Sequence, residues 1–419
     1  MNTKLQLNLL NFLQFFIWGC WLITIGSYLF QLGWSPSQFG YIYATIGISA
    51  IGFPAFFGYL TDRYFSLMKV YRALHLSAAL LMLFLPSILN PTLFFWVLLF
   101  YMIAYMASIP MLVSFCYSKL NEENYNVKSV YPKIRVWGSI GFILALWLVS
   151  LTDNETTVYQ FYLSSLASLV LFVVTFFIIE APRIKPKAPF SFQKALGLQV
   201  FQAITNKEVY YFFGFAFFFG IALIVSNGYT NPFLHDIKTT ISNPEAILVK
   251  YPAVVVSVSQ IAEVFFILLM PLVLKRLAIH WILILSFIAW TIKFLLLSLI
   301  NPENSLVLVL LSCVFYGMAF NFFLIAGSIY LDENTVKEYR GSMQGFFVMV
   351  VNGFGALFGS FTSGILIDGF FTVSGRREWS SIWLFFALVL FFIVVLYYLL
   401  LFKSKKAGEN ESEFPNKFL

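Results

Sequence analysis

The sequence predicts an all-α membrane protein with twelve transmembrane helices arranged as two six-helix halves. Three observations carry this prediction. Of the 419 residues, 60% are hydrophobic and only 11% are charged, whereas soluble domains carry about 25% charged residues. Twelve apolar runs follow one another along the chain, and each is close to the roughly 20 residues that cross a bilayer as a helix. A basic segment containing prolines separates the first six runs from the last six.

The first six apolar runs are continuous enough to be helices, because a backbone in lipid must satisfy its own hydrogen bonds. Strands of a membrane barrel would instead alternate apolar and polar residues over about ten positions. The first run begins close to Met1 but is longer than the apolar part of a signal peptide, so we expect it to be retained. We place the six runs at residues 6–30, 39–60, 70–89, 92–115, 134–152 and 158–181.

The second half begins after the predicted linker, residues 182–208, where prolines stand among lysines and an arginine. We therefore divide the chain into an N-terminal half (1–181), a cytoplasmic linker (182–208), a C-terminal half (209–402) and a cytoplasmic tail (403–419). The last six runs lie at residues 209–234, 252–274, 280–299, 305–331, 341–368 and 380–402.

Lysine and arginine set the predicted orientation, because short loops rich in these residues stay in the cytoplasm. With the N-terminus inside, nearly all of the 26 basic residues fall in inner segments. The exceptions are Lys238, Lys250, Arg376 and Arg377 in outer loops and Lys293 inside the ninth run. Both termini are therefore predicted to be cytoplasmic. Since the basic residues lie between apolar runs rather than on one surface, the net charge of +7 does not indicate a nucleic-acid partner.

The inner end of the second run carries Gly58, Asp62 and Arg63. A helix that ends with an acid and a base can form a charge latch with a neighbouring helix end. This spacing resembles the G-x-x-x-D-R loop of the major facilitator superfamily, although the usual following glycine and basic pair are missing. Six spans on each side of a linker are also typical of carriers with a binding site between two repeats.

A carboxyl group inside the bilayer is costly and is by default a functional hypothesis. Glu263 is the carboxylate nearest the middle of a run, and a group at that depth can load and release protons. A structural, neutral or arginine-paired glutamate is the alternative. Ser259 and Gln260 share its helix face. The carboxamide of Gln260 offers donors and an acceptor that suit a nucleobase edge or a sugar diol, or it forms a hydrogen bond between helices.

Two other runs offer polar and aromatic candidates. In the seventh run, Asn227 shares a face with Thr230 and Asn231, which line a cavity or belong to a solvated helix end. In the tenth run, Tyr316, Phe320 and Asn321 lie within about one turn, so their rings can stack on a planar ligand. With 51 Phe and 22 Tyr in the chain, ordinary core or lipid-facing aromatics are the alternative.

Arg135 opens the fifth run, and its long side chain reaches either into a cavity or back to the interface. Lys293 is interpreted as structural. No metal site is expected, because the three histidines lie near span ends and do not cluster. Cys20, Cys116 and Cys313 show no ligand spacing and are interpreted as packing residues. The chain lacks a Walker A motif and a recognisable nucleophile–base pair. We therefore expect neither ATP hydrolysis, nor an enzyme, nor a cofactor.

Four segments carry a resemblance to a known family: Leu10 to Trp21 with Gly26 to Tyr28, Ile134 to Phe142, Ser257 to Glu263, and Asn352 to Gly355. Together they resemble the bacterial nucleoside:proton symporters of the major facilitator superfamily. The resemblance implies import of nucleosides with protons across a bacterial inner membrane. It places substrate and coupling residues at Arg135, Ser139, Phe142, Asn227, Gln260, Glu263, Tyr316 and Phe320.

Two positions depart from the family pattern: Ile224 replaces an expected glutamine, and Asn321 replaces an expected aspartate. The chain then has Glu263 as its central proton acceptor, and its base preference is open. We predict a proton-coupled nucleoside importer with Asn321 among the ligand-binding residues and with no obligatory protein partner. The alternatives are a carrier of a sugar or glycoside, a nucleoside facilitator without proton coupling, and a non-transporting receptor on a carrier fold.

Overall fold

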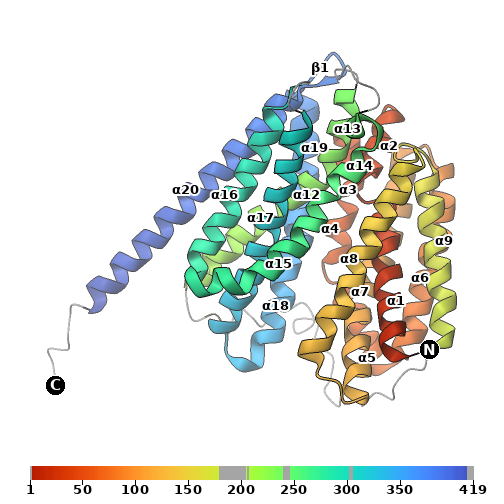
Figure 1. Ribbon diagram of the computed structural model, residues 1–419, viewed down its shortest axis with the longest axis horizontal. Helices are drawn as coiled ribbons and strands as arrows, with labels where there is room; N and C mark the ends of the chain where they lie inside the picture. The colour runs from red at the N-terminus through yellow and green to blue at the C-terminus, as the bar shows by residue number, and fades with distance from the viewer. Residues whose placement is uncertain (1, 179–203, 205–206, 239–245, 302–304, 413–419) are drawn as a thin grey trace.

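The structure, a computed structural model, is a bundle of long helices with one small β-hairpin (Figure 1). It describes residues 2–178, 204, 207–238, 246–301 and 305–412. The predicted linker lies almost wholly outside the described residues. In the first part of the chain the helices are α1 (Thr3–Gly19), α2 (Ile25–Gln31), α3 (Pro36–Tyr43), α4 (Thr45–Ala50), α5 (Phe53–Arg63), α6 (Leu67–Phe84), α7 (Pro91–Glu122), α8 (Val127–Leu151) and α9 (Tyr159–Val174).

The second part of the chain contains the remaining helices and the hairpin. In chain order these are α12 (Lys207–Ile237), α13 (Ile247–Lys250), α14 (Pro252–Val256), α15 (Val258–Arg276), α16 (Ile279–Ser298), α17 (Ser305–Glu333), α18 (Arg340–Met349), a π-helical segment (Val350–Gly355), α19 (Ala356–Phe370), β1 (Thr372–Val373), β2 (Arg376–Arg377) and α20 (Trp379–Ser412). The hairpin, which hydropathy does not predict, joins α19 to α20.

Among the described residues, eleven helical segments are long and apolar enough to cross a membrane. The predicted first span, 6–30, is not one continuous helix. α1 ends at Gly19, the chain turns, and α2 begins at Ile25. Gly19 marks a close approach, because a β-carbon there would lie 2.5 Å from the carbonyl oxygen of Phe142 on α8. Hydropathy misses this break because the turn residues are as apolar as the helices around them.

Two other predicted spans are also interrupted. The span that contains α3, α4 and α5 bends at Gly52, whose φ of 81° is a left-handed conformation that favours glycine. The span from Lys337 to Phe370 contains the π-helical segment, where the sequence Asn352 to Gly355 supplies two glycines. π-Helical turns are rare and occur frequently at functional sites. α20 continues to Ser412, beyond residue 402 where hydropathy predicts its end.

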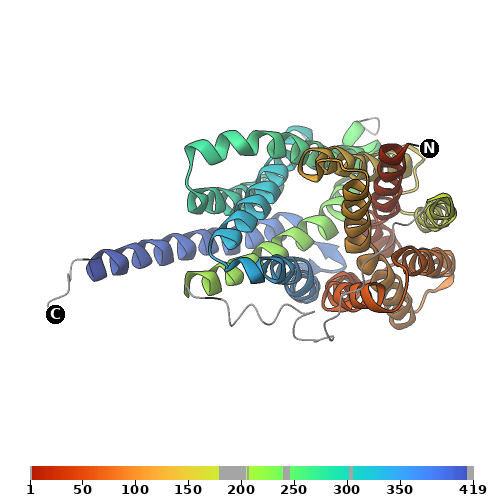
Figure 2. The same ribbon diagram turned by 90° about the horizontal axis from the view of Figure 1, so that it is seen from below.

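Helices α1 to α9 lie on one side of the molecule and α12 to α20 on the other, as both views show (Figures 1 and 2). The two groups contact one another through α3 and α19, α2 and α12, and α8 and α14. At the α3–α19 crossing, a β-carbon on Gly40 would lie 2.4 Å from the carbonyl oxygen of Ser360 and 2.8 Å from the Cα of Gly364. The backbones therefore touch directly near the β-hairpin, at what we term the hairpin end.

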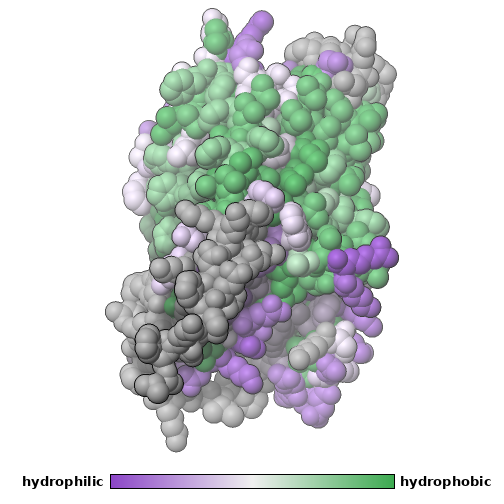
Figure 3. All heavy atoms as spheres, turned by 90° about the vertical axis from the view of Figure 1, so that its left-hand side faces the viewer, coloured by the Kyte–Doolittle hydropathy of each residue, from purple (hydrophilic) through white to green (hydrophobic). Residues whose placement is uncertain are grey.

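The start of α1 and the end of α20 lie toward the opposite end of the bundle, which we term the termini end (Figure 1). The side view shows a broad apolar surface above a rim of hydrophilic residues at the termini end (Figure 3). α20 carries large exposed apolar side chains, among them Phe391 and Phe392, which are 56% and 64% exposed. Such a continuous apolar surface suits lipid and not water.

Candidate functional site

α15 carries two of the predicted site residues one turn apart, Gln260 and Glu263. Gln260 is 8% exposed, and its side-chain oxygen has no hydrogen-bond partner within the described part of the chain. Glu263 is partly buried. A buried amide oxygen without a partner loses the hydrogen bonds it would make in water. This helix face therefore has an unused acceptor beside an ionisable carboxyl group.

Tyr316 of α17 joins several of the predicted residues. Its hydroxyl donates a hydrogen bond to the side-chain oxygen of Asn227 on α12, at 3.0 Å. Its ring is stacked with that of Phe320, with centroids 6.0 Å apart and planes 6° apart, and meets Trp290 of α16 edge-on at 5.4 Å. Parallel rings next to a polar group suit a flat heterocycle that also needs hydrogen bonds.

Arg135 of α8 comes from the other group of helices. Its guanidinium lies over the ring of Phe15 of α1, 3.9 Å from the centroid. The residue is partly buried and lies within electrostatic range of Glu263. The sequence left open whether Arg135 reaches inward or back to the interface. The structure places its guanidinium along α8 beside Gly138, where an added β-carbon would lie 2.6 Å from the Arg135 Nη1.

Asn321 and Gly317 fix α17 against α15. The amide nitrogen of Asn321 donates to the main-chain carbonyl oxygens of Glu263 at 2.8 Å and of Gly317 at 3.1 Å. A β-carbon on Gly317 would lie 2.5 Å from the carbonyl carbon of Ala262 and 2.6 Å from the main-chain nitrogen of Glu263. The two helices therefore touch at the residue that bears the carboxyl group.

Lys293 of α16 is 1% exposed and lies beside this site. Its ammonium nitrogen is 5.4 Å from the ring centroid of Tyr316. A buried cation over an aromatic face is stabilised by about 2 kcal/mol or more. The Lys293 ammonium therefore stabilises the position of the Tyr316 ring.

Within the part of the chain that the structure describes, three other positions form no hydrogen bond to these residues. Ser139 lies one turn beyond Arg135 and is partly buried, and Phe142 packs its backbone against Gly19. Ile224, at the departure from the family pattern, is 5% exposed and contacts the Gly359 region of α19. Its apolar side chain therefore packs between helices α12 and α19.

The predicted latch residues lie on α5, toward the termini end. Gly58 has open space where a β-carbon would be. Asp62 and Arg63 are exposed, at the last residues of the helix. This position is compatible with a latch that closes against another helix end.

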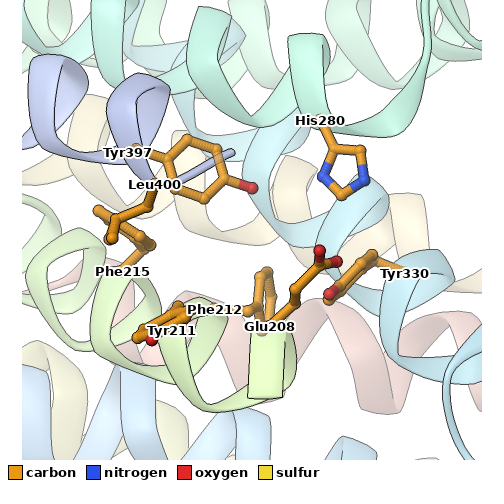
Figure 4. A pocket seen from close by; sticks show the side chains of 8 residues that line it. All are labelled: Glu208, Tyr211, Phe212, Phe215, His280, Tyr330, Tyr397 and Leu400. Carbon is orange, nitrogen blue, oxygen red and sulfur yellow. The ribbon is translucent and has the colours of Figure 1, made fainter. Parts of the chain in front are cut away.

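A separate hollow lies between α12, α16, α17 and α20 (Figure 4). Tyr211, Phe212 and Phe215 line one side, and Tyr330, Tyr397 and Leu400 line the others. The Glu208 carboxylate lies between Tyr330 and His280. None of the predicted site residues lines this hollow. It is small and lined chiefly by aromatic rings, and all four of these helices belong to the same group.

Sequence reasoning missed a buried polar cluster at the hairpin end. Glu155, in the turn between α8 and α9, is 4% exposed, and its carboxylate accepts hydrogen bonds from Asn231 and His235 of α12. The sequence indicates Asn231 only as part of a polar face of the seventh run. The signal was weak because Glu155 lies outside the apolar runs and its partners are far away in sequence.

Residues 1–407 match the family described as Nucleoside H+ symporter. This chain belongs to the nucleoside H+ symporter family. It is 38% identical to the xanthosine permease of Escherichia coli (strain K12), and 35% identical to the nucleoside permease NupG of the same organism. Each alignment covers 92% of this chain and 93% of the relative.

Solved structures agree with the family. Two crystal structures of the nucleoside transporter NupG, one of them of a point mutant, superpose with TM-scores of 0.87 and 0.90 at 34% identity. They cover 95% of this chain and at least 99% of theirs. A POT family transporter at 14% identity, with a TM-score of 0.71, shares the fold alone. The predicted family is confirmed, and this nucleoside H+ symporter is a transporter and not an enzyme.

Proposed function

We propose that this symporter imports nucleosides together with protons by alternating access across a bacterial inner membrane. The substrate would bind between the two groups of helices, and Glu263 would exchange the proton. The observation that carries the proposal is a pair on α15. The amide oxygen of Gln260 has no hydrogen-bond partner among the described residues, and one turn away lies a carboxyl group within electrostatic range of Arg135 of the opposite group.

The proposed binding roles follow from these contacts. Gln260 would accept a hydrogen bond from the nucleoside, and Asn227, held by the Tyr316 hydroxyl, would present its amide nitrogen. The rings of Phe142, Tyr316 and Phe320 would pack against the flat faces of the nucleobase. Arg135 and Ser139 would contact the nucleoside from α8. Asn321 would act chiefly through its hydrogen bond to the main-chain carbonyl oxygen of Glu263.

Proton coupling would use the charge balance between Arg135 and Glu263. When Glu263 is ionised, Arg135 attracts α15 toward α8, which couples the two groups of helices. Protonation of Glu263 would remove this attraction and change the relative free energies of the two conformations. A ligand or proton moves such an equilibrium only by its different affinities for the two states.

The transmembrane arrangement is part of the proposal. We infer twelve spans, with α1 and α2 together forming the first, organised as halves 1–181 and 209–402 around the linker 182–208. Both termini, including the tail 403–419, would be cytoplasmic, so the hairpin end would face outward. Supporting this orientation, the start of α1, which carries Lys4, and the end of α15, which carries Lys275 and Arg276, lie toward the termini end (Figure 1).

The test is uptake of radiolabelled uridine and adenosine into proteoliposomes, with and without a pH gradient that is acidic outside. We expect gradient-driven uptake in the wild type, and loss of the gradient effect with counterflow retained in Glu263→Gln. Glu338→Gln, which removes an exposed carboxylate, is the control and should behave as wild type. Uptake that does not depend on the pH gradient would indicate a nucleoside facilitator without proton coupling. Competition by sugars but not by nucleosides would indicate a sugar carrier.

A further inference from the structure

Glu155 forms a bridge between the two groups of helices at the hairpin end. One carboxylate oxygen accepts from the Asn231 amide nitrogen at 2.8 Å and from the His235 Nε2 at 2.8 Å, both on α12. The other accepts from the main-chain nitrogen of Ala253 on α14, at 3.0 Å, and from the hydroxyl of Ser150 at the end of α8. Three of the four donors therefore belong to the opposite group.

Four donors around two oxygens suit the ionised carboxylate best. An ionised carboxylate is purely an acceptor with about four lone-pair sites, whereas a protonated carboxyl group carries a hydrogen that needs an acceptor. The Ala253 amide cannot become an acceptor, and the Asn231 amide nitrogen cannot either. The His235 Nε2 and the Ser150 hydroxyl can each accept the added hydrogen. Protonation of Glu155 nevertheless removes the negative charge from all four hydrogen bonds, three of which join the two groups, and hydrogen bonds to a charged acceptor are roughly twice as strong as those to a neutral one.

The surrounding groups extend the bridge. The side-chain oxygen of Asn231, which is fully buried, accepts from the Ser27 hydroxyl of α2. Nearby, Arg377 of β2 forms a bidentate pair with Asp236 of α12, and its guanidinium lies 4.0 Å from the ring centroid of Phe30 on α2. Contacts across the two groups thus surround Glu155 on the α2 side as well.

We propose that Glu155 is a proton-binding site that controls an outer gate: its ionised carboxylate holds the hairpin end closed, and protonation from the outside releases it. This inference rests on the proposed alternating-access cycle and its orientation. It assigns no part of substrate binding to Glu155. It adds a second protonation site at the opposite end of the transport path from the predicted latch at Asp62 and Arg63.

The electrostatics agree with the geometry. Burial alone raises the pKa of Glu155, but the hydrogen bond and charge of His235, with hydrogen bonds from Asn231 and Ser150, outweigh it and lower the pKa. Among the described residues, the charged and titratable groups that face Glu155 are His235 and Lys238 of α12, with Asp153 of its own turn near Lys238. Opening the gate would expose Glu155 to water and return its pKa toward about 4.3.

The direction of the effect follows from this difference. The open form holds its proton more tightly than the closed form, so a falling pH favours the open form. For each unit by which the pKa is higher in the open form, full protonation multiplies the open-to-closed ratio by about ten. We therefore expect a lower pH to open the outer gate.

Spin labels at Tyr159 and Val373, exposed positions near the hairpin end of the two groups, report this gate by their distance in detergent or nanodiscs without substrate. In wild type we expect a longer distance to become populated as the pH is lowered from neutral to about 4. Glu155→Gln should show the longer distance at neutral pH and respond little to acid. Asp153→Asn removes a neighbouring exposed carboxylate at a left-handed position that asparagine tolerates, and should match wild type.

A wild-type distance that does not change with pH would overturn the proposal, as would a Glu155→Gln variant with the wild-type distance and pH response. An Asp153→Asn variant that behaves like Glu155→Gln would show that general loop charge is responsible, which also overturns it. If Glu155→Gln does not assemble, His235→Leu removes one bridging donor, and a wild-type distance there would refute the bridge. Because no substrate is present, failure here is distinct from failure of nucleoside uptake.

Discussion

The amide nitrogen of Asn321 lies 2.8 Å from the main-chain carbonyl oxygen of Glu263, so the tenth span holds the backbone that carries the proposed proton acceptor. A hydrogen bond between membrane helices is worth about 1 kcal/mol. Asn321→Leu should therefore lower pH-driven nucleoside uptake by about fivefold, since 1.36 kcal/mol corresponds to a tenfold change in rate. Initial rates in proteoliposomes measure this.

The control for Asn321→Leu is Ser312→Ala, on the same helix. The Ser312 hydroxyl donates only within its own helix, to the carbonyl oxygen of Val309. Its removal should leave uptake unchanged. Equal rates in wild type and Asn321→Leu would show that the hydrogen bond to Glu263 does not matter for coupling.

Gln260→Leu should have opposite effects on stability and on binding. The unpartnered amide oxygen of Gln260 is buried, so an apolar side chain of similar size should raise the melting temperature of the ligand-free protein. The same change should weaken nucleoside binding by about tenfold, because a ligand hydrogen bond is lost. Thermal melts with and without uridine measure both effects. A variant that is destabilised but binds normally would place Gln260 outside the site.

Gly317→Ala should separate α17 from α15. The added methyl group would lie 2.5 Å from the carbonyl carbon of Ala262, where backbone cannot easily move. Overpacking of this kind costs about 1–3 kcal/mol, so the melting temperature should fall and uptake should fall with it. Gly214→Ala, on α12 with no atom within 4 Å of the added methyl group, is the matched control and should be neutral or slightly stabilising.

Lys293→Met should raise the KM for nucleoside counterflow more than it lowers the maximal rate. The substitution keeps the length of the side chain but removes the cation next to the Tyr316 ring. A less firmly held Tyr316 would present a poorer stacking surface. Lys275→Met, at an exposed position on α15, is the control and should have no effect. A lower maximal rate with an unchanged KM would contradict a role in holding the binding surface.

Acid should destabilise the protein partly through Glu155. Its pKa is lowered in the folded protein by His235, Asn231 and Ser150 against the effect of burial. A group with a lowered folded pKa contributes stability above its unfolded pKa of about 4.3, and that contribution is lost as the pH falls through the folded value. Melting temperatures measured from neutral pH to about pH 3 should therefore fall less steeply in Glu155→Gln than in wild type. Parallel curves would exclude this contribution.

The sequence predicted most of the spans and the helices that carry the candidate site. Spans are predictable because the bilayer imposes a continuous apolar length on each of them. Polar residues such as Gln260 and Glu263 are conspicuous against that background. The break after Gly19 was not predictable, because it depends on the close approach of Phe142 from a helix far away in sequence.

The bridge at Glu155 was not predictable for a related reason. A carboxylate in a short outer turn looks solvated, and its burial depends on Asn231, His235 and Ala253, all from the other group of helices. Asn321 shows the converse case. The sequence indicated a polar residue beside the site, but only the structure reveals that its donors are engaged with the backbone.

The close contact of Gly40 with Gly364 at the hairpin end has a consequence for the speed of transport. Glycine has no side-chain rotamers to lose on burial. When α3 and α19 separate at these glycines and then come together again, no side chain at this contact has to return to a particular rotamer. This part of the seal can therefore part and re-form as a rigid-body motion with little entropic cost, which favours rapid turnover over long residence in either conformation.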